Sequence, residues 1–598
     1  MHGDTDSAVL LIVPPFYAYG HPSLGTAVLK SALKKKGISS AVLYANALYA
    51  RRIGVEFYRD IMAVVSPDEL YQEQIFSPSA HGVAPAPAPA PAAPRGESFY
   101  TRYYELFANK RTSLSDQELA RARDAIPGFL AAVVEEVRRV RPRIVGLSSL
   151  YSQVNASLAI ARAVKQALPE VTVVIGGTNC YGEMGRELAR FAHVDYLFDG
   201  EADLTFPAFC ENRLAGGEPP ADRLIRCAPV ESLEDQDLPD YDDFLAQYPP
   251  DERKDIFLYL ETSRGCWWGV KNRCQFCGIS YEGMSFRTMS PRKAAAQLCA
   301  MRRRYPEYKL YYACDSVFPD EFFDEFFDGL TEGGFDGSLF YQIKPMFDID
   351  RLRKMKAHGV DMLGPGIESL STRHLKMMKK GTTAATNIAV LRNCKELGIE
   401  AKWNHLVALP NDAAEDYDEI SDRLPLLQHL DPPIITPIYL QRYSPYFDRH
   451  DEHGITGLRP MGGYGKSFPG DIDLMKLAYN FDGEMNSDVR SHPEILARFM
   501  LEIGKWYDRW SANPAELVVF REGKRLLVRD TRDCAVEEVT EIDAAEMEQL
   551  RACRSFRPRT LVDGDMSGLV KRGFVAEIDG GFLTLVCGTG ALAEPAGR

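Results

Sequence analysis

The sequence predicts an α/β protein built from a doubly wound sheet, a partial (β/α)6 barrel and a small α+β C-terminal domain. Two observations predict it. Short apolar runs alternate with segments of helical periodicity along most of the 598 residues, which is typical of parallel sheets covered by helices. From residue 513 onward, pairs of apolar runs are instead joined by Glu-Gly or Asp-Gly-Gly, which is a hairpin pattern.

The doubly wound part opens with a β-α-β unit. Residues 8–13 (AVLLIV) form a short β-branched run that Pro14 and Pro15 end, and helical spacing follows over residues 23–36 up to Gly37. A second strand is expected at residues 40–44. Later elements are a helix over residues 156–167 and strands at residues 144–147, 171–175 and 194–198. We therefore place the first domain at residues 1–215.

An Ala/Pro alternation over residues 77–94 interrupts this domain. Such a run cannot build a core, so we expect a solvated, semi-rigid insertion. The α/β pattern resumes after it, which places the insertion within the domain. Residues 216–250 are expected to form a linker.

The alternation restarts in residues 251–445. Ser290 followed by Pro291 is a helix start, and Gly398 is a helix stop. The six expected strands are residues 257–262, 310–313, 339–343, 362–367, 401–409 and 434–439. Six β/α units predict a partial barrel with its active site at the carboxyl ends of the strands.

The C-terminal part differs in pattern. Residues 446–512 are expected to form a helical connection. Two hairpins, at residues 517–529 and 574–586, flank helical segments at residues 544–553 and 569–573. The order hairpin, helices, hairpin over residues 513–598 resembles a small winged-helix domain.

Composition excludes several classes of protein. Lys and Arg number 70 against 84 Asp and Glu, a net charge of -14, which argues against nucleic acid or an anionic membrane as partner. The twelve cysteines are too irregularly spaced for a disulfide scaffold. No signal peptide and no apolar run long enough to span a bilayer is seen, so we expect a cytoplasmic protein.

The strongest motif is a cysteine triad. Cys266 lies in SRGCWWG, and Cys274 and Cys277 lie in CQFCG. Three thiolates on one loop can hold three irons of a [4Fe–4S] cluster and leave the fourth iron open for S-adenosylmethionine (SAM). A structural zinc site needs a fourth ligand, and no suitable Cys or His pair is nearby. Three unrelated core cysteines is the remaining alternative. The other nine cysteines show no second cluster spacing and are expected to be packing residues.

This loop resembles the radical SAM superfamily, although its first gap has seven residues where CxxxCxxC has three. The CWWG and CxFCG segments, the latter with Phe276 and Gly278, resemble a subgroup that matures ribosomally synthesised peptides. The resemblance also implies SAM contacts at strand ends, by Glu368 and Ser369 of GIES, Asn404 and Asp315. Lys380-Gly381-Thr382 follows, as in many cobalamin-dependent members.

The first domain resembles the cobalamin-binding domain that precedes such barrels. Every matching position lies at the carboxyl end of an expected strand, where open α/β sheets bind ligands. They are Pro14, Pro15, Ser148, Ser149, Gly176, Gly177, Thr178, Gly200 and Glu201. A plain flavodoxin-like domain is the alternative. The DxHxxG motif is absent and His21 lacks the matching Asp, so no protein histidine is expected on the cobalt.

The resemblance implies a SAM-dependent C-methyltransferase that uses methylcobalamin on an unactivated carbon of a precursor peptide. Its partners would be that peptide and an electron donor such as a flavodoxin or ferredoxin. The alternatives are a non-methylating cobalamin radical enzyme, which cyclises or rearranges its substrate, and a cobalamin-sensing regulator. The tail is acidic, which disfavours a DNA reader; it either docks a leader peptide or merely packs on the barrel.

Overall fold

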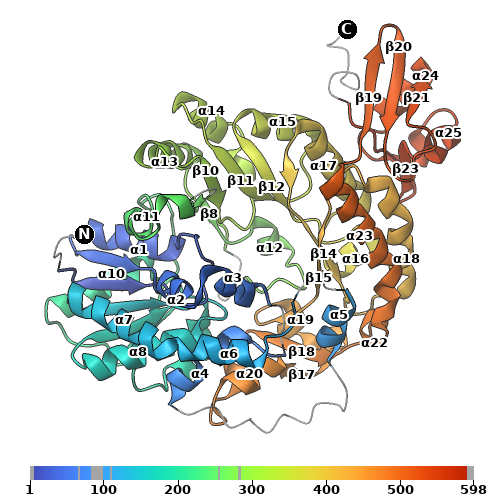
Figure 1. The fold of residues 1–598 in the computed structure, drawn as a ribbon. Coiled ribbons are helices and arrows are strands. Elements are labelled where there is room, and N and C mark those ends of the chain that lie inside the picture. Colours follow the sequence, from blue (N-terminus) through green and yellow to red (C-terminus); the bar gives the residue numbers. More distant parts are fainter. Residues whose placement is uncertain are drawn as a thin grey trace.

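The computed structural model describes residues 6–64, 68–82, 98–107, 111–253, 256–279 and 285–588, and all that follows concerns these residues. Figure 1 shows two large α/β parts that face each other and a small C-terminal part at the outer end of the second. None of the described helices is long and apolar enough to cross a membrane.

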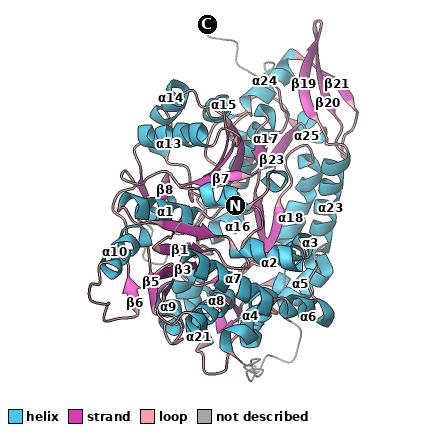
Figure 2. Cartoon of the chain, turned by 60° about the vertical axis from the view of Figure 1, so that its left-hand side comes forward, coloured by secondary structure: helices cyan, strands magenta, loops and turns pink. Residues whose placement is uncertain are grey.

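The first part is a six-stranded parallel sheet in the order β2-β1-β3-β4-β5-β6. Helices α1 and α10 cover one face, and α7 and α8 the other (Figure 2). The strands are β1 (Val9–Ile12), β2 (Ser40–Leu43), β3 (Ile144–Ser148), β4 (Thr172–Gly176), β5 (Tyr196–Asp199) and β6 (Leu224–Arg226), and the covering helices are α1 (Leu24–Lys35), α7 (Ile126–Val140), α8 (Val154–Ala167) and α10 (Ala202–Leu214). The first five strands confirm the predicted doubly wound sheet.

Further helices occupy the long segment between β2 and β3, in which we expected no strand. They are α2 (Ala45–Ile53), α3 (Val55–Ala63), α4 (Tyr71–His81), α5 (Phe99–Phe107) and α6 (Asp116–Asp124). The predicted insertion at residues 77–94 was wrong in its first residues, because Ser77 and Ala80 are buried in the last turns of α4, which packs on α8. Residues 83–94 of that insertion lie outside the described residues.

The predicted linker at residues 216–250 also contains structure. Strand β6 pairs with β5 and completes the sheet, and α11 (Asp242–Gln247) packs beside β2. A three-residue strand is too short to show a period of two, which is why the sequence did not reveal it.

The second part is the predicted partial barrel. Five parallel strands run in the order β13-β12-β11-β10-β7, and β14 pairs with β15 in a further parallel pair. A bridge between Glu368 and His405 joins β14 to the chain beyond β12. The strands are β7 (Phe257–Leu260), β10 (Leu310–Ala313), β11 (Ser338–Ile343), β12 (Val360–Pro365), β13 (Glu400–Ala401), β14 (Asn404–Val407) and β15 (Ile434–Pro437). The expected fifth strand is thus two short strands.

Most helices of this part line the outside of the barrel, whereas α12 (Trp267–Lys271) lies between the two large parts (Figure 1). Ser290 caps α13 by accepting a hydrogen bond from the Lys293 amide, and Gly398 ends α17 with a φ of 65°, as the sequence predicts. The helices are α12 (Trp267–Lys271), α13 (Pro291–Arg304), α14 (Glu325–Glu332), α15 (Ile349–Ala357), α16 (Thr372–Met377), α17 (Ala384–Leu397) and α18 (Ala414–Arg423). The inner face carries stacked aromatic rings, with Tyr312 and Phe340 centroids 4.1 Å apart.

The segment after the barrel is not the purely helical connection that we expected. It contains an antiparallel sheet of β16 (Leu440–Gln441), β18 (Asn480–Glu484) and β17 (Thr456–Pro460). Its strands contain Gly and Pro and lack apolar alternation, so their pattern does not indicate a sheet. The helices here are α19 (Pro445–Asp448), α20 (Gly462–Ser467), α21 (Leu474–Leu477), α22 (Asp488–Ser491) and the long α23 (Ala497–Ala512).

The C-terminal part consists of two antiparallel three-stranded sheets, which contain both predicted hairpins. It packs against the barrel's outer side, where the buried Arg392 of α17 donates to the Thr584 carbonyl over 2.7 Å. Its elements are β19 (Leu517–Glu522), β20 (Arg525–Asp530), β21 (Val539–Ile542), α24 (Ala544–Ala552), β22 (Arg557–Pro558), α25 (Ser567–Lys571), β23 (Val575–Ile578) and β24 (Gly581–Thr584).

Candidate functional site

The cysteine triad lies on the loop that follows β7, as the sequence predicts. Cys266 directly precedes α12, and all three cysteines are free and half-buried. The loop is held at both sides of Cys274, because the Gln275 amide donates to Met378 and the Gln275 carbonyl accepts from Tyr446. Burial raises the pKa of the Cys277 thiol to about 11, and Cys274 and Cys266 lie close enough to act on it electrostatically.

Two motifs that lie far apart in the sequence meet beside these thiols. Gly381 has a φ of 71°, and a Cβ there would lie 2.2 Å from the Trp268 ring, so only glycine fits. The Trp268 indole donates to the Lys379 carbonyl over 3.4 Å. The Trp-Trp-Gly segment after Cys266 and the Lys-Gly-Thr segment therefore form one packed unit.

Glu368 lies at the edge of this unit. Its carboxylate pairs with Lys380 at 3.0 Å, and both side chains are largely buried. Lys380 also lies over the Phe276 ring, 5.7 Å from its centroid, and acts on Cys274 and Cys277 electrostatically. A carboxylate at this place can accept a hydrogen bond from the amino group of SAM, which is the role that the sequence resemblance implies.

Other predicted contacts are placed differently. The Ser369 side chain is fully buried and accepts from the Ser371 amide, so its hydroxyl faces the core. Asp315 is equally buried and accepts hydrogen bonds from Thr262 and Ser263, which anchors the start of the cysteine loop. The resemblance implies a SAM contact for Ser369, and Asp315 was expected to make one because it follows a strand. Both side chains make hydrogen bonds within the protein, and their contact with SAM stays a prediction. Asn404 begins β14 with an exposed side chain.

Gly278 lies in a tight space behind the third cysteine. A Cβ there would lie 2.5 Å from the Arg442 carbonyl, and Tyr479 donates to the Gly278 carbonyl over 3.2 Å. The sequence did not reveal Tyr479, which comes from the segment that we expected to be a helical connection.

The donor set fits an iron–sulfur cluster. Among the described residues, no three His, Cys, Asp or Glu side chains converge on a single metal ion. In a [4Fe–4S] cluster each thiolate binds a different iron, so the cysteines need only surround one volume. Three free thiols on one loop, beside two buried lysines, Lys344 and Lys380, meet that need.

The carboxyl edge of the first sheet also fits its expected ligand. The Ser148 and Thr178 hydroxyls are buried without a hydrogen-bond partner, and both are residues that the sequence assigns to cobalamin. Such orphaned groups are rare unless a ligand or water satisfies them. At Gly177, with a φ of 111°, a Cβ would lie 2.5 Å from the Ser149 carbonyl, so this turn requires glycine.

The neighbouring loops hold this edge together. Gln153 donates to the Pro14 carbonyl over 2.7 Å and accepts from the Leu150 amide, which joins the loops after β1 and β3. Ser149 accepts from the Asn179 side chain over 3.0 Å, so its hydroxyl is engaged within the protein. The other predicted positions here, Pro15, Gly176 and Gly200, lie at the ends of β1, β4 and β5.

Glu201, which the resemblance assigns to the cobalamin site, forms ion pairs across the two domains. Its carboxylate pairs with Arg264 at 3.0 Å and Arg287 at 2.6 Å, both from the cysteine loop of the barrel. Burial alone would raise the pKa of Glu201, but the hydrogen bond from Arg287 holds this pKa below its usual value. Arg264 also pairs with Asp203 and Glu261. We call these five charged residues the seam network, because it joins the two domains.

His21 also crosses between the domains. Its Nδ1 lies 2.6 Å from the Tyr259 hydroxyl, and the two rings stack. His21 is thus a loop residue that is engaged by the protein, as the sequence predicts. Tyr151, after β3, is 64% exposed although it lies between the domains, and its ring contacts Tyr479.

A cavity of about 450 Å³ lies between the two predicted sites. It is lined by Gly177 and Gly200 of the first domain and by Gly265, next to Cys266, of the barrel. Cys314 also lines it and is exposed, so the expectation that this cysteine is a buried packing residue was wrong. It directly follows β10 at the carboxyl edge of the barrel, where the apolar run stops and the core ends.

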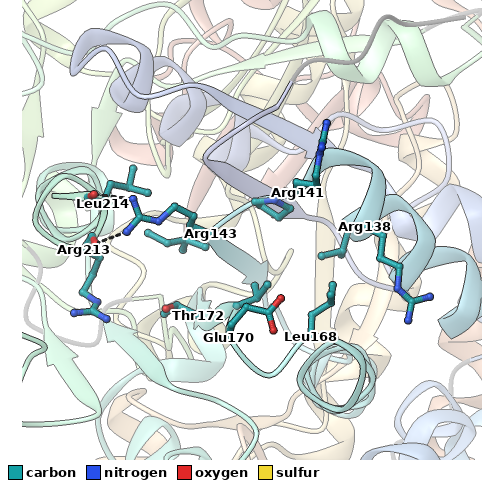
Figure 3. A pocket seen from close by; sticks show the side chains of 12 residues that line it. Arg138, Arg141, Arg143, Leu168, Glu170, Thr172, Arg213 and Leu214 are labelled. Carbon is teal, nitrogen blue, oxygen red and sulfur yellow. Dashed lines mark hydrogen bonds between the residues drawn. The ribbon is translucent and has the colours of Figure 1, made fainter. Parts of the chain in front are cut away.

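Another cavity, of about 490 Å³, lies at the opposite edge of the first sheet (Figure 3). It borders the first residues of β3 and β4, whereas ligands of open α/β sheets bind at the carboxyl ends. Arg143 there donates to the Leu214 and Arg213 carbonyls, and Arg141 pairs with Asp6. These arginines are engaged within the chain.

Comparison with known proteins agrees with this geometry. Residues 118–210 match the B12 binding domain and residues 260–424 match the radical SAM superfamily. An uncharacterised methyltransferase of Pyrococcus horikoshii is 22% identical over 48% of this chain. A 4′-phospho-dehydrooxetanocin synthase of Priestia megaterium is 26% identical over 29% of it, and the cobalamin-dependent radical SAM methyltransferase TokK of Streptomyces tokunonensis is 31% identical over 17%. The chain spans 64%, 26% and 15% of the lengths of these three proteins.

Solved structures share the fold. The cobalamin-dependent SAM radical enzyme OxsB, with aqua-cobalamin and SAM bound, superposes with a TM-score of 0.56 over 84% of this chain and 67% of its own, at 14% identity. The radical SAM methyltransferase TsrM of Kitasatospora setae gives 0.54 over 83% and 89%, also at 14% identity. The two matched domains imply a [4Fe–4S] cluster, SAM and cobalamin as cofactors. The chain therefore carries a B12 binding domain ahead of a radical SAM domain, which is the domain pair of cobalamin-dependent radical SAM enzymes.

Proposed function

We propose that this enzyme transfers a methyl group to an unactivated carbon of a ribosomally synthesised peptide. One observation carries the methyl transfer: the 450 Å³ cavity touches both the glycine turns of the B12 binding domain and the loop of Cys266. A substrate held there would lie between the source of the radical and the methyl carrier. Two of the relatives with matching sequence are named methyltransferases, which supports the same reaction.

When bound, the cluster and SAM supply a 5′-deoxyadenosyl radical, and cobalamin supplies a transferable methyl group. The protein's part is to position these groups and to exclude water. The seam network fixes the distance between the two domains, and Glu368 offers a carboxylate for the SAM amino group. The reaction needs no acid–base pair. Among the described residues that line the cavity, the three carboxylates, Glu201, Asp203 and Glu261, are all paired with arginine.

The peptide substrate is supported by the resemblance of the CWWG and CxFCG loop to peptide-maturing enzymes. The C-terminal part offers a place for a leader peptide. The outer edge of β19 is occupied, because Val519 donates to Cys587 and Cys587 donates to Leu517. Strand β21 ends the same sheet on the other side, and Val539 on it is exposed. An extended peptide could add to that edge by main-chain hydrogen bonds.

The test begins with anaerobic reconstitution and quantification of iron, sulfide and cobalamin. The loaded enzyme is then given reductant, a candidate precursor peptide and SAM with a deuterated methyl group. The proposal expects a product heavier by one labelled methyl group, with one 5′-deoxyadenosine released per turnover. Absence of any methylated product from all peptides, with both cofactors bound, would refute peptide methylation. A flavodoxin or ferredoxin is the electron donor that we propose for the cell.

A second candidate is a cyclisation or rearrangement without methyl transfer. The sequence match to a 4′-phospho-dehydrooxetanocin synthase supports this second candidate. Product mass separates the two, because this reaction adds no methyl group to the substrate. A cobalamin-sensing regulator would instead keep its function in Cys277→Ala, which lacks a cluster ligand.

A further inference from the structure

Lys344 is a buried lysine beside the cysteine loop that the sequence did not single out. It follows β11 at the carboxyl edge of the barrel and is 5% exposed. Its ammonium lies 3.7 Å from the centroid of the Trp268 ring and donates to the Lys380 carbonyl. One side chain thus touches both segments that pack around the thiols.

The described residues give Lys344 no carboxylate within ion-pair distance. Its neighbours are the Trp268 ring, a carbonyl oxygen and the ammonium of Lys380, which repels it. Glu368 is the carboxylate of this group, and it pairs with Lys380. Two buried cations against one carboxylate leave an excess positive charge, and a buried charge without a counter-charge is unfavourable.

A bound cluster would supply the missing negative charge. Three thiolates around a doubly positive [4Fe–4S] core carry one net negative charge, and each one-electron reduction adds another. Lys344 acts electrostatically on both Cys274 and Cys266, so its charge faces that volume. The excess positive charge of these side chains and the net negative charge of the cluster would have the same size and opposite sign.

We propose that Lys344 is the counter-charge of the cluster: a positioning residue that favours the reduced cluster and fixes Trp268 through a cation–π contact. The inference rests on the cysteine loop holding the cluster, and it does not depend on the methyl acceptor. The redox step is the entry of one electron from a reductant into the cluster, with no bond made or broken. A positive charge a few ångströms away lowers the energy of the added electron.

The test compares Lys344→Met, which keeps the apolar stem, with Lys344→Arg, which keeps the charge. Lys354→Met is the matched control, because Lys354 lies on the outer helix α15 and pairs with Asp324. Each protein is reconstituted with iron and sulfide, and its iron content is measured first. The midpoint potential is then measured at neutral pH by a dithionite titration followed by electron paramagnetic resonance, without substrate.

We expect Lys344→Met to disfavour cluster reduction about tenfold, which is about 59 mV for a one-electron couple. Lys344→Arg and Lys354→Met should stay near the wild-type potential. If Lys344→Met loses its iron while Lys344→Arg keeps it, the charge is needed for the cluster itself, which also supports the proposal. Equal potentials in all four proteins, or loss of iron in both Lys344 variants, would overturn it. Iron absent from the wild type would instead refute the cluster assignment.

Discussion

Removal of Arg264 should destabilise the junction between the two domains more than any surface ion pair does. Its guanidinium pairs with Glu201, Asp203 and Glu261 at 2.6–3.0 Å, and the four side chains are 15–23% exposed. Removing one partner of a buried ion pair costs about 3–5 kcal/mol, since the other charges stay behind. Because this network is partly hydrated, we expect Arg264→Met to cost about 3 kcal/mol, at the lower end.

Tryptophan fluorescence is a suitable assay. All five tryptophans lie between residues 267 and 510, and Trp403 and Trp506 are fully buried, so their emission reports the barrel side of the junction. With a denaturant slope of about 3 kcal/mol per molar urea, the loss lowers the urea midpoint by about 1 M. Arg59→Met is the control, because Arg59 pairs with Glu56 at an exposed site and should cost less than about 0.5 kcal/mol.

A second substitution tests the cause. In Arg264→Met the carboxylate of Asp203 loses its partner, so Asp203→Asn should recover part of the loss when it is added to that variant. In the wild type the same change should be destabilising, because it breaks the pair. If Arg264→Met shifts the urea midpoint no more than Arg59→Met, the seam network does not hold the domains together, and the reasoning fails.

Three further predictions concern the cysteine loop. Cys277→Ala should lose most of the reconstituted iron while Cys314→Ala keeps it; equal iron in both variants would contradict the assignment of the triad. Burial raises the pKa of Asp315 from 3.8 to about 6, so the folded protein binds this proton more tightly than the unfolded chain does. Proton binding by Asp315 therefore stabilises the fold below about pH 4, and this stabilisation is lost as the pH rises to about 6. Asp315→Asn keeps the shape of the side chain and does not titrate, so its free energy of unfolding should rise by up to about 3 kcal/mol relative to that of the wild type between pH 4 and pH 6. The same difference in urea midpoint between the two proteins at both pH values would contradict this prediction. Gly381→Ala places a Cβ 2.2 Å from the ring of Trp268 and should lower the free energy of unfolding by about 2–3 kcal/mol more than Gly398→Ala does. Gly398 is the control, because it has a similar positive φ but open space around it. Equal urea midpoints of the two variants would show that the ring moves aside.

The strands were the most predictable part of the fold. The runs that became β10 and β11 are contiguous, apolar and bounded by polar turns, so they matched within one residue. The expected fifth barrel strand spans β13 and β14, because the buried Trp403 continues the apolar pattern through the break. Strand β6 has three residues and leaves no periodic signal at all.

The site was predictable only where residues are close in sequence. The cysteine triad can be recognised because one loop carries all three ligands. Lys344, Trp268 and Gly381 meet only after folding, and a single sequence shows no pairing between them. Glu201 lies at the end of β5, as the sequence predicts, but the sequence did not reveal its two arginine partners. A carboxylate at a strand end can face a cofactor or another domain, and local sequence does not distinguish the two.

The facing of the two domains follows from their topology. Open parallel sheets bind ligands at their carboxyl edges, so two cofactors can act on one substrate only if these edges oppose each other. The chain achieves this with a polar junction: Arg264, two residues before Cys266, reaches Glu201, one residue after the Gly200 turn. Charged side chains regain water readily when a junction separates, whereas apolar faces do not. A junction of this kind therefore holds the two carboxyl edges on either side of one cavity.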